Sequence, residues 1–217
     1  MKNVWNLVYK DLKILVHPVT LLYCILSMGM TFIPMYPAFI GPFYILIGVM
    51  ITITTEGQYK DKEFCGVLPV SKADCIKARM LTVMILELAT IVLTVPCAIL
   101  SVILLDMQLM GMENSFTSLS GILLGYAAAN ALMISADFRG QFKAVVPSLI
   151  GMVLYFAICF AMSSLWHIPG LEFLAGNSAA NLIRQLPLLI AAILIYLLAA
   201  YLTCKASVKS YEKAVIG

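Results

Sequence analysis

The residues best suited to chemistry or recognition lie in one charged stretch, residues 56–79, between two long apolar runs. The charged, capping and apolar contact residues within it are Lys60, Asp61, Lys62, Glu63, Phe64, Leu68, Pro69, Ser71, Asp74 and Lys77. Mixed charges around a few apolar side chains suit docking against a soluble protein better than covalent chemistry. The alternative interpretation is an ordinary solvated linker.

Local signals in this stretch predict helical structure. Ser71 followed three residues later by Asp74 resembles a capping box, with Asp in place of the usual Glu or Gln. We therefore expect a helix to begin after Ser71 and to continue through Lys77 and Arg79 into the next apolar run. Charges around Phe64 also suggest a short surface helix that ends at Pro69.

Glu87 is the other residue that suggests chemistry, because it lies well inside an apolar run. An ionised carboxylate in that position is unfavourable unless it is paired or hydrated. Glu87 is thus a candidate cavity-lining residue that meets a substrate or a proton. The alternatives are a carboxylate near the membrane interface and a carboxyl bonded to a neighbouring helix.

The remaining reactive residues are too sparse for catalysis or for a metal site. Neither of the two histidines, His17 and His167, has an Asp or Glu at helical ligand spacing, and Cys65 and Cys75 lack companions at zinc spacing. The sequence has no glycine-rich loop ending in Gly-Lys-Ser or Gly-Lys-Thr. We expect no catalytic residue, no metal and no cofactor in this chain, and the net charge of +3 does not indicate a nucleic-acid partner.

The composition indicates that the elements carrying these residues lie in a membrane. The 217 residues are 62% hydrophobic and only 12% charged, whereas a soluble domain has about 25% charged residues. The apolar runs are the length of helices that cross a hydrocarbon core of about 30 Å. We therefore expect a single all-α transmembrane domain, residues 1–217, with six spans near 18–35, 38–55, 80–105, 117–136, 145–166 and 185–204.

Basic residues predict the orientation. All of the 14 Lys and Arg residues except Arg184 fall in one alternating set of segments: the N-terminus, 56–79, 137–144 and the C-terminal tail. The positive-inside rule places that set, with both termini, in the cytoplasm. Small residues in the fourth span, Gly121, Gly125, Ala128 and Ala129, predict close helix packing there.

The N-terminal segment, residues 2–16, has an amphipathic pattern. Trp5 and other apolar residues share one arc, Lys10 and Lys13 lie on the opposite arc, and Asp11 is an exception inside the apolar arc. Such a helix is expected to lie in the membrane interface. Its polar face either faces water or contacts a cytoplasmic partner.

Two segments resemble the permease family of type-2 ATP-binding-cassette (ABC-2) exporters. They are residues 68–74 with Glu56, Lys77 and Arg79, and residues 7–13 with His17 and Pro18 behind them. The resemblance is closest to short Gram-positive permeases, including exporters of amphipathic toxin peptides such as the phenol-soluble modulins.

This resemblance implies a function and a set of partners. The chain would be the permease subunit of an ATP-driven exporter in the bacterial plasma membrane, moving amphipathic or hydrophobic peptides or lipid-like molecules outward. Two permease subunits would pair, identical or different, and a separate ATPase would bind ATP and Mg. The motion of this ATPase would be transmitted by residues 2–16 and by a coupling helix within 58–77. A re-entrant segment on the outer side would be formed by residues 167–184.

Two other function classes fit the sequence less well. An ion-coupled transporter or channel would need several intramembrane charges or broken repeats, and the runs contain one glutamate. An intramembrane enzyme would need a nucleophile with a base, or a metal constellation, and the two histidines fall on opposite sides of the predicted membrane.

Overall fold

The computed structural model describes residues 2–33, 37–56, 69–105, 116–138, 144–176 and 178–214. Within these ranges the chain is all-helical and contains no strand. The expectation of an all-α protein is therefore confirmed for the part of the chain that is described.

The N-terminal segment forms two helices with a sharp bend between them. α1 (Lys2–Lys10) runs into a π-helical turn, Asp11–Leu15, and α2 (Pro18–Met30) leaves at 85° to this first segment. His17 defines the bend, because its ring nitrogen accepts a hydrogen bond from the Val19 amide at 3.2 Å and thereby caps α2. Pro18 suits the first helical position, where its missing N–H is not needed.

α3 (Ile40–Glu56) returns alongside α2 and packs closely against it. The Thr20 hydroxyl donates to the Gly48 carbonyl at 2.9 Å. A side chain at Gly48 would lie 2.7 Å from a Thr20 methyl group. Glycine is therefore what allows the two backbones to approach here.

α5 (Lys72–Leu105) is a single helix of 34 residues. It begins directly after Ser71, whose hydroxyl accepts a hydrogen bond from the Asp74 amide at 3.1 Å. The predicted helix start after Ser71 and its continuation through Lys77 and Arg79 are confirmed. The last part of the charged stretch, from Lys72 to Arg79, and the apolar run that follows it thus lie on one helix.

The C-terminal half consists of α6 (Phe116–Asp137), α7 (Val145–Ser164) and α8 (Ala179–Ala214). Two single 3₁₀ turns, Leu165–His167 and Glu172–Leu174, connect α7 to α8. α8 begins earlier than the hydropathy predicted, at Ala179 rather than near residue 185. The predicted segment 167–184 therefore includes the first turns of α8, and its re-entrant placement stays a prediction.

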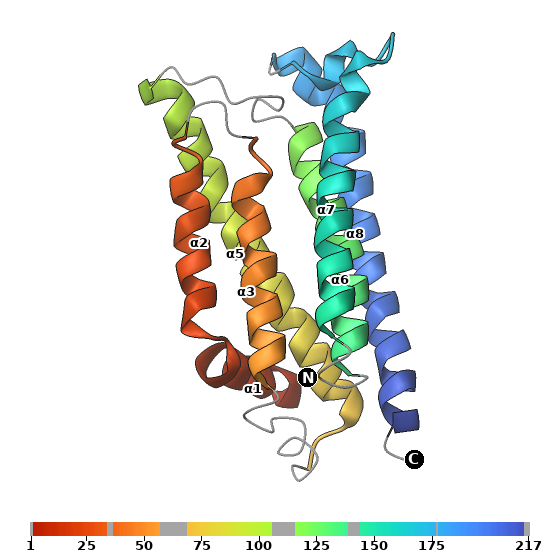
Figure 1. Cartoon of the computed structure of the whole chain (residues 1–217). Coiled ribbons are helices and arrows are strands. Elements are labelled where there is room, and N and C mark those ends of the chain that lie inside the picture. Colours follow the sequence, from red (N-terminus) through yellow and green to blue (C-terminus); the bar gives the residue numbers. More distant parts are fainter. Residues whose placement is uncertain are drawn as a thin grey trace.

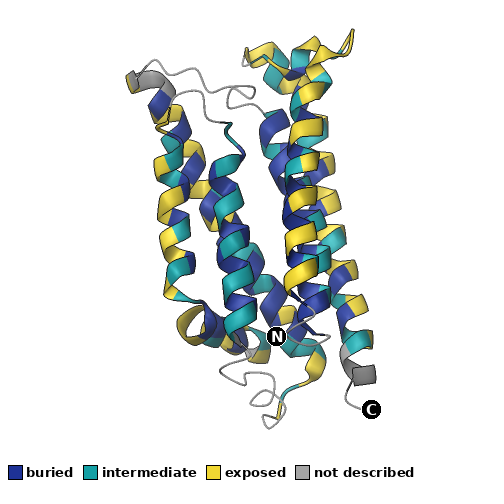
Figure 2. Cartoon of the chain, in the orientation of Figure 1, coloured by how far each residue is buried: buried dark blue, intermediate teal, exposed yellow. Residues whose placement is uncertain are grey.

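The helices form two groups that lie side by side (Figure 1). α2, α3 and α5 make one group, and α6 packs against both α7 and α8 in the other. α6 is buried along most of its length, while α2, α7 and α8 turn exposed apolar faces outward (Figure 2). The predicted close packing of α6 is confirmed, since side chains added at Gly121 and Gly125 would meet Met162 and Tyr155 of α7.

Four helical segments are long and apolar enough to cross a membrane: 72–101, 116–137, 145–167 and 179–210. The two N-terminal helical segments, Asn3–Leu15 and Pro18–Met30, give a fifth span if they are counted together as one bent span. α2 and α3 have 13 and 17 residues, fewer than the roughly 20 that a simple span needs. The described residues thus support four or five spans, and the count of six stays a prediction.

Candidate functional site

The candidate site is the end of the bundle where α1 meets the beginning of α5, near both chain termini (Figure 1). Leu7 and Val8 of α1 are buried against Ala78 of α5, with Val4 and Leu81 packed around them. The two segments that the sequence singled out are therefore in direct contact. A displacement of either one is transmitted to the other through this packing, because close-packed side chains deform little.

A buried charge cluster lies beside this contact. The Arg79 Nε of α5 is 3.4 Å from Asp11 Oδ2, and Arg79 Nη1 is 3.9 Å from Asp137 Oδ2 at the end of α6. Lys10 Nζ also approaches Asp11 Oδ1, at 3.2 Å. Arg79, Asp11 and Asp137 are all buried. The cluster joins the N-terminal segment, α5 and α6 through one guanidinium.

Sequence reasoning identified only part of this cluster. It marked Asp11 as a charge inside an apolar arc and Arg79 as part of the family resemblance, but it did not pair them. Their partners are distant in sequence, so no local spacing signal joins them. Asp137, the last residue of α6, approaches Arg79 from a separate helix.

The predicted coupling residues that are described lie on the outside of this end. Pro69, Ser71, Lys77 and Lys13 are exposed, and Asp74 is partly buried. Lys13 places its ammonium 5.6 Å from the centre of the Tyr9 ring. Lys10 alone is drawn into the cluster described above. Lys60, Asp61, Lys62, Glu63, Phe64 and Leu68 lie outside the described residues.

Glu87 lies about midway along α5 and is completely buried. Its Oε2 accepts two hydrogen bonds, from the Tyr196 hydroxyl of α8 at 2.6 Å and from the Asn130 amide of α6 at 3.0 Å. Glu87 Oε1 and Asn130 Oδ1 have no hydrogen-bond partner among the described residues. This geometry favours the interpretation of Glu87 as a carboxyl bonded to neighbouring helices.

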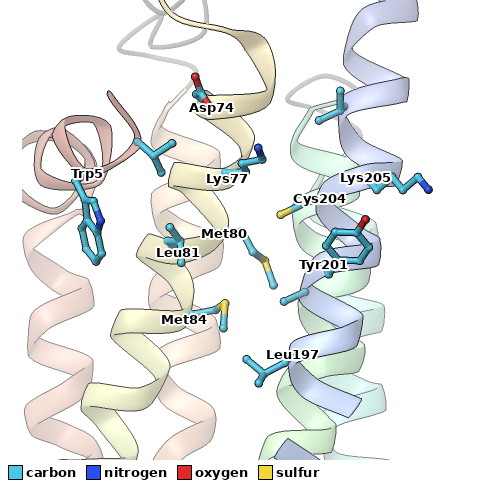
Figure 3. Close-up of a pocket in the computed structure, with 13 residues that line it drawn as sticks. Trp5, Asp74, Lys77, Met80, Leu81, Met84, Leu197, Tyr201, Cys204 and Lys205 are labelled. Carbon is cyan, nitrogen blue, oxygen red and sulfur yellow. The ribbon is translucent and has the colours of Figure 1, made fainter. Parts of the chain in front are cut away.

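A groove lies between α5 and α8 and reaches α1 (Figure 3). We call it the α5–α8 groove; it encloses about 820 Å³. Its lining residues are Val4, Trp5, Asp74, Lys77, Met80, Leu81, Met84, Leu197, Ala200, Tyr201, Cys204, Lys205 and Val208. The walls are therefore mainly apolar, and the charged side chains gather at one end.

The described residues offer no group of three His, Cys, Asp or Glu side chains that could hold a metal ion. The buried carboxyls found there are held by arginine, tyrosine and asparagine. The site as described therefore consists of packed apolar side chains and buried charges.

Comparison with known proteins gives one match. A family model described as ABC-2 family transporter protein matches residues 6–212. No curated protein and no solved structure matches the chain. The matched range contains α5, the charge cluster and every residue that lines the α5–α8 groove except Val4 and Trp5.

Proposed function

Because the chain belongs to the ABC-2 family of transporter proteins, we propose that it is the permease subunit of an ATP-driven exporter. It is a multi-pass membrane protein, and its ATPase is a separate chain. The 56–79 stretch and the N-terminal helix receive the motion of that ATPase, and the transmembrane helices convert it into transport.

The observation that carries this proposal is the linkage around Arg79. α5 runs without interruption from the charged stretch into the apolar bundle, and Arg79 joins it to the N-terminal segment and to α6. A push on the beginning of α5 therefore reaches both helix groups. The continuity of α5 from Lys72 into the bundle and the buried cation of Arg79 support a coupling role over an ordinary solvated linker.

Topology and assembly follow from the same proposal. α2 and α3 also cross the membrane, which makes six spans, and both termini lie in the cytoplasm. Two permease subunits pair, and the exposed apolar faces of α2 and α7 are surfaces for lipid or for that partner. The chain itself binds no nucleotide, since ATP and Mg belong to the partner.

We further propose that the substrate is amphipathic or hydrophobic, and the apolar character of the exposed faces supports this. An amphipathic or hydrophobic peptide, or a lipid-like molecule, already partitions into the bilayer and can approach such a bundle from the side. Peptide toxins of the phenol-soluble-modulin type fit this substrate class. The direction of transport that we propose is out of the cell.

The test is a transport assay with the permease and its ATPase in proteoliposomes. Lys60, Asp61, Lys62 and Glu63 are changed together to Gln or Asn, and both ATP hydrolysis and movement of a labelled amphipathic peptide are measured. We expect the number of peptides transported per ATP hydrolysed to fall roughly tenfold. A loss of about 1.4 kcal/mol in the free energy that couples hydrolysis to transport has this effect.

Lys209→Gln is the matched control, because Lys209 is exposed on α8 and does not line the α5–α8 groove. It should leave transport per ATP unchanged. If the loop variant transports as efficiently as the unaltered protein, the coupling role is refuted. Peptide transport that persists without ATP and follows a proton gradient would favour an ion-coupled transporter instead.

A further inference from the structure

The α5–α8 groove opens between two helices that are both long and apolar enough to cross a membrane. Met80, Met84 and Leu197 lie along its walls (Figure 3). In a bilayer, an apolar groove of this size is filled by hydrocarbon, because water there would leave the apolar side chains solvated. The molecules available in bulk to fill it are membrane lipids.

The charged residues lie at one end of the groove only. Lys77 of α5 and Lys205 of α8 are exposed there, on opposite walls. Met84 is two helical turns further along α5 than Lys77, roughly 10 Å. The groove therefore offers two ammonium groups at one level and apolar side chains further along. This arrangement matches a phospholipid, which has a charged headgroup followed by apolar acyl chains.

Aromatic residues reinforce that polarity. Trp5 and Tyr201 are exposed and line the groove at the end where Lys77 and Lys205 lie (Figure 3). Trp and Tyr favour the level of lipid headgroups, where the ring is buried and its polar atom is hydrated. Asp74 offsets one of the two lysines, so one net positive charge remains.

We propose that the α5–α8 groove binds an anionic phospholipid of the bilayer. Its headgroup phosphate lies between Lys77 and Lys205, and an acyl chain runs along Met80, Met84 and Leu197. Basic pockets between transmembrane helices select anionic headgroups in this way. The inference rests on α5 and α8 being membrane spans and does not depend on which substrate is transported.

The chain carries a reporter for this site, because it has two tryptophans and one of them, Trp5, lines the groove. In a Trp166→Phe protein, Trp5 is the only source of tryptophan fluorescence. The protein is placed in vesicles of zwitterionic phosphatidylcholine with increasing fractions of phosphatidylglycerol, and either lipid carries the brominated, fluorescence-quenching chain. One net positive charge predicts a roughly fivefold preference for phosphatidylglycerol around Trp5.

Two charge variants test the cause of that preference. Lys77→Gln with Lys205→Gln should remove it, while Lys209→Gln, on the same helix but outside the lining, should retain it. A Trp5→Phe protein reports from Trp166, at the opposite end of the bundle, and should show no preference. Quenching in pure brominated phosphatidylcholine should be equal for all charge variants, which establishes that each is folded.

Equal quenching of Trp5 by the two lipids would overturn the proposal, as would a preference that survives loss of both lysines. Either result would mean that the groove holds bulk lipid or a protein partner. A preference that depends on Lys77 and Lys205 supports the site, even if the loop variant of the transport assay shows no uncoupling.

Discussion

Arg79 is a buried cation that approaches two buried carboxylates, those of Asp11 and Asp137. Removing one member of a buried pair is costly, because the remaining charge stays desolvated without its counterion. Here the loss of the guanidinium would leave both Asp11 and Asp137 without it. The cluster therefore fixes how the N-terminal segment and α6 lie against α5.

We predict that Arg79→Gln lowers the free energy of unfolding by about 3–5 kcal/mol. Thermal unfolding in detergent measures the effect as a lower midpoint, with the exposed Lys209→Gln as control. Adding Asp11→Asn to Arg79→Gln should recover part of the loss, because it removes a buried charge that no longer has the guanidinium beside it. An unchanged midpoint for Arg79→Gln alone would show that the cluster does not hold these segments together.

Tyr196 provides a second prediction at this scale. Tyr196→Phe removes the 2.6 Å hydrogen bond to Glu87 and nothing else. The expected loss of stability is about 0.5–2 kcal/mol, the range for single hydrogen bonds of this kind in membranes and in water. Tyr201→Phe is the matched control, since Tyr201 is exposed on the same helix. Equal unfolding midpoints for the two variants would show that the hydrogen bond between Tyr196 and Glu87 does not stabilise the protein.

Individual residues were predictable from the sequence, but their partners were not. Glu87 stood out because a carboxylate inside an apolar run is rare, yet Asn130 and Tyr196 are 43 and 109 residues away in sequence. Both look like ordinary polar residues of an apolar helix. The burial of Arg79 was not predictable either. Lys72 and Lys77 are close to it in sequence and carry the same charge, yet both are exposed.

At the scale of elements, small residues decide how closely α6 and α7 approach. A side chain at Gly125 would lie 2.6 Å from the Tyr155 ring. That ring cannot move freely, because its hydroxyl donates to the Phe39 carbonyl at 2.8 Å. The α6–α7 contact thus depends on glycine at this position.

We predict that Gly125→Ala costs about 1–3 kcal/mol through overpacking. Gly29→Ala is the control, because nothing lies within 4 Å of a side chain added there and α2 gains a better helix former. The measurement is thermal unfolding of both variants side by side. A Gly125→Ala protein at least as stable as Gly29→Ala would contradict the packing described.

The elements also show where sequence patterns succeed and fail. The beginning of α5 was predictable, because the Ser71 cap is a local signal that α5 uses. The beginning of α8 was not, because Asn181, Arg184 and Gln185 lower the hydropathy of its first turns. Gln185 is nonetheless buried, and its amide donates to the Phe173 carbonyl at 2.8 Å and the Gly176 carbonyl at 3.1 Å. A hydropathy count cannot show that polar groups are satisfied by a neighbouring turn.

At the scale of the whole molecule, polar contacts join the two helix groups at three levels. Arg79 and Asp137 meet at the end that carries the termini, and Glu87 reaches Asn130 and Tyr196 midway. Tyr126 and Tyr155 donate to backbone carbonyls of residues 42 and 39 towards the other end. One buried hydrophobic cluster also spans both groups. The proposed transport cycle requires the two groups to shift as rigid bodies, so these polar contacts and this cluster would rearrange together.

The central claim is that the beginning of α5 faces the cytoplasm, where the ATPase binds. The most direct measurement is maleimide labelling of a Lys72→Cys variant, in which the first residue of α5 is the single cysteine. The six native cysteines are replaced, and Ala180→Cys, exposed at the opposite end, is the control. A membrane-impermeant maleimide should label position 72 only in inverted vesicles, and less so when the ATPase is bound, while position 180 is labelled in intact cells. Labelling of position 72 from outside intact cells would contradict the account.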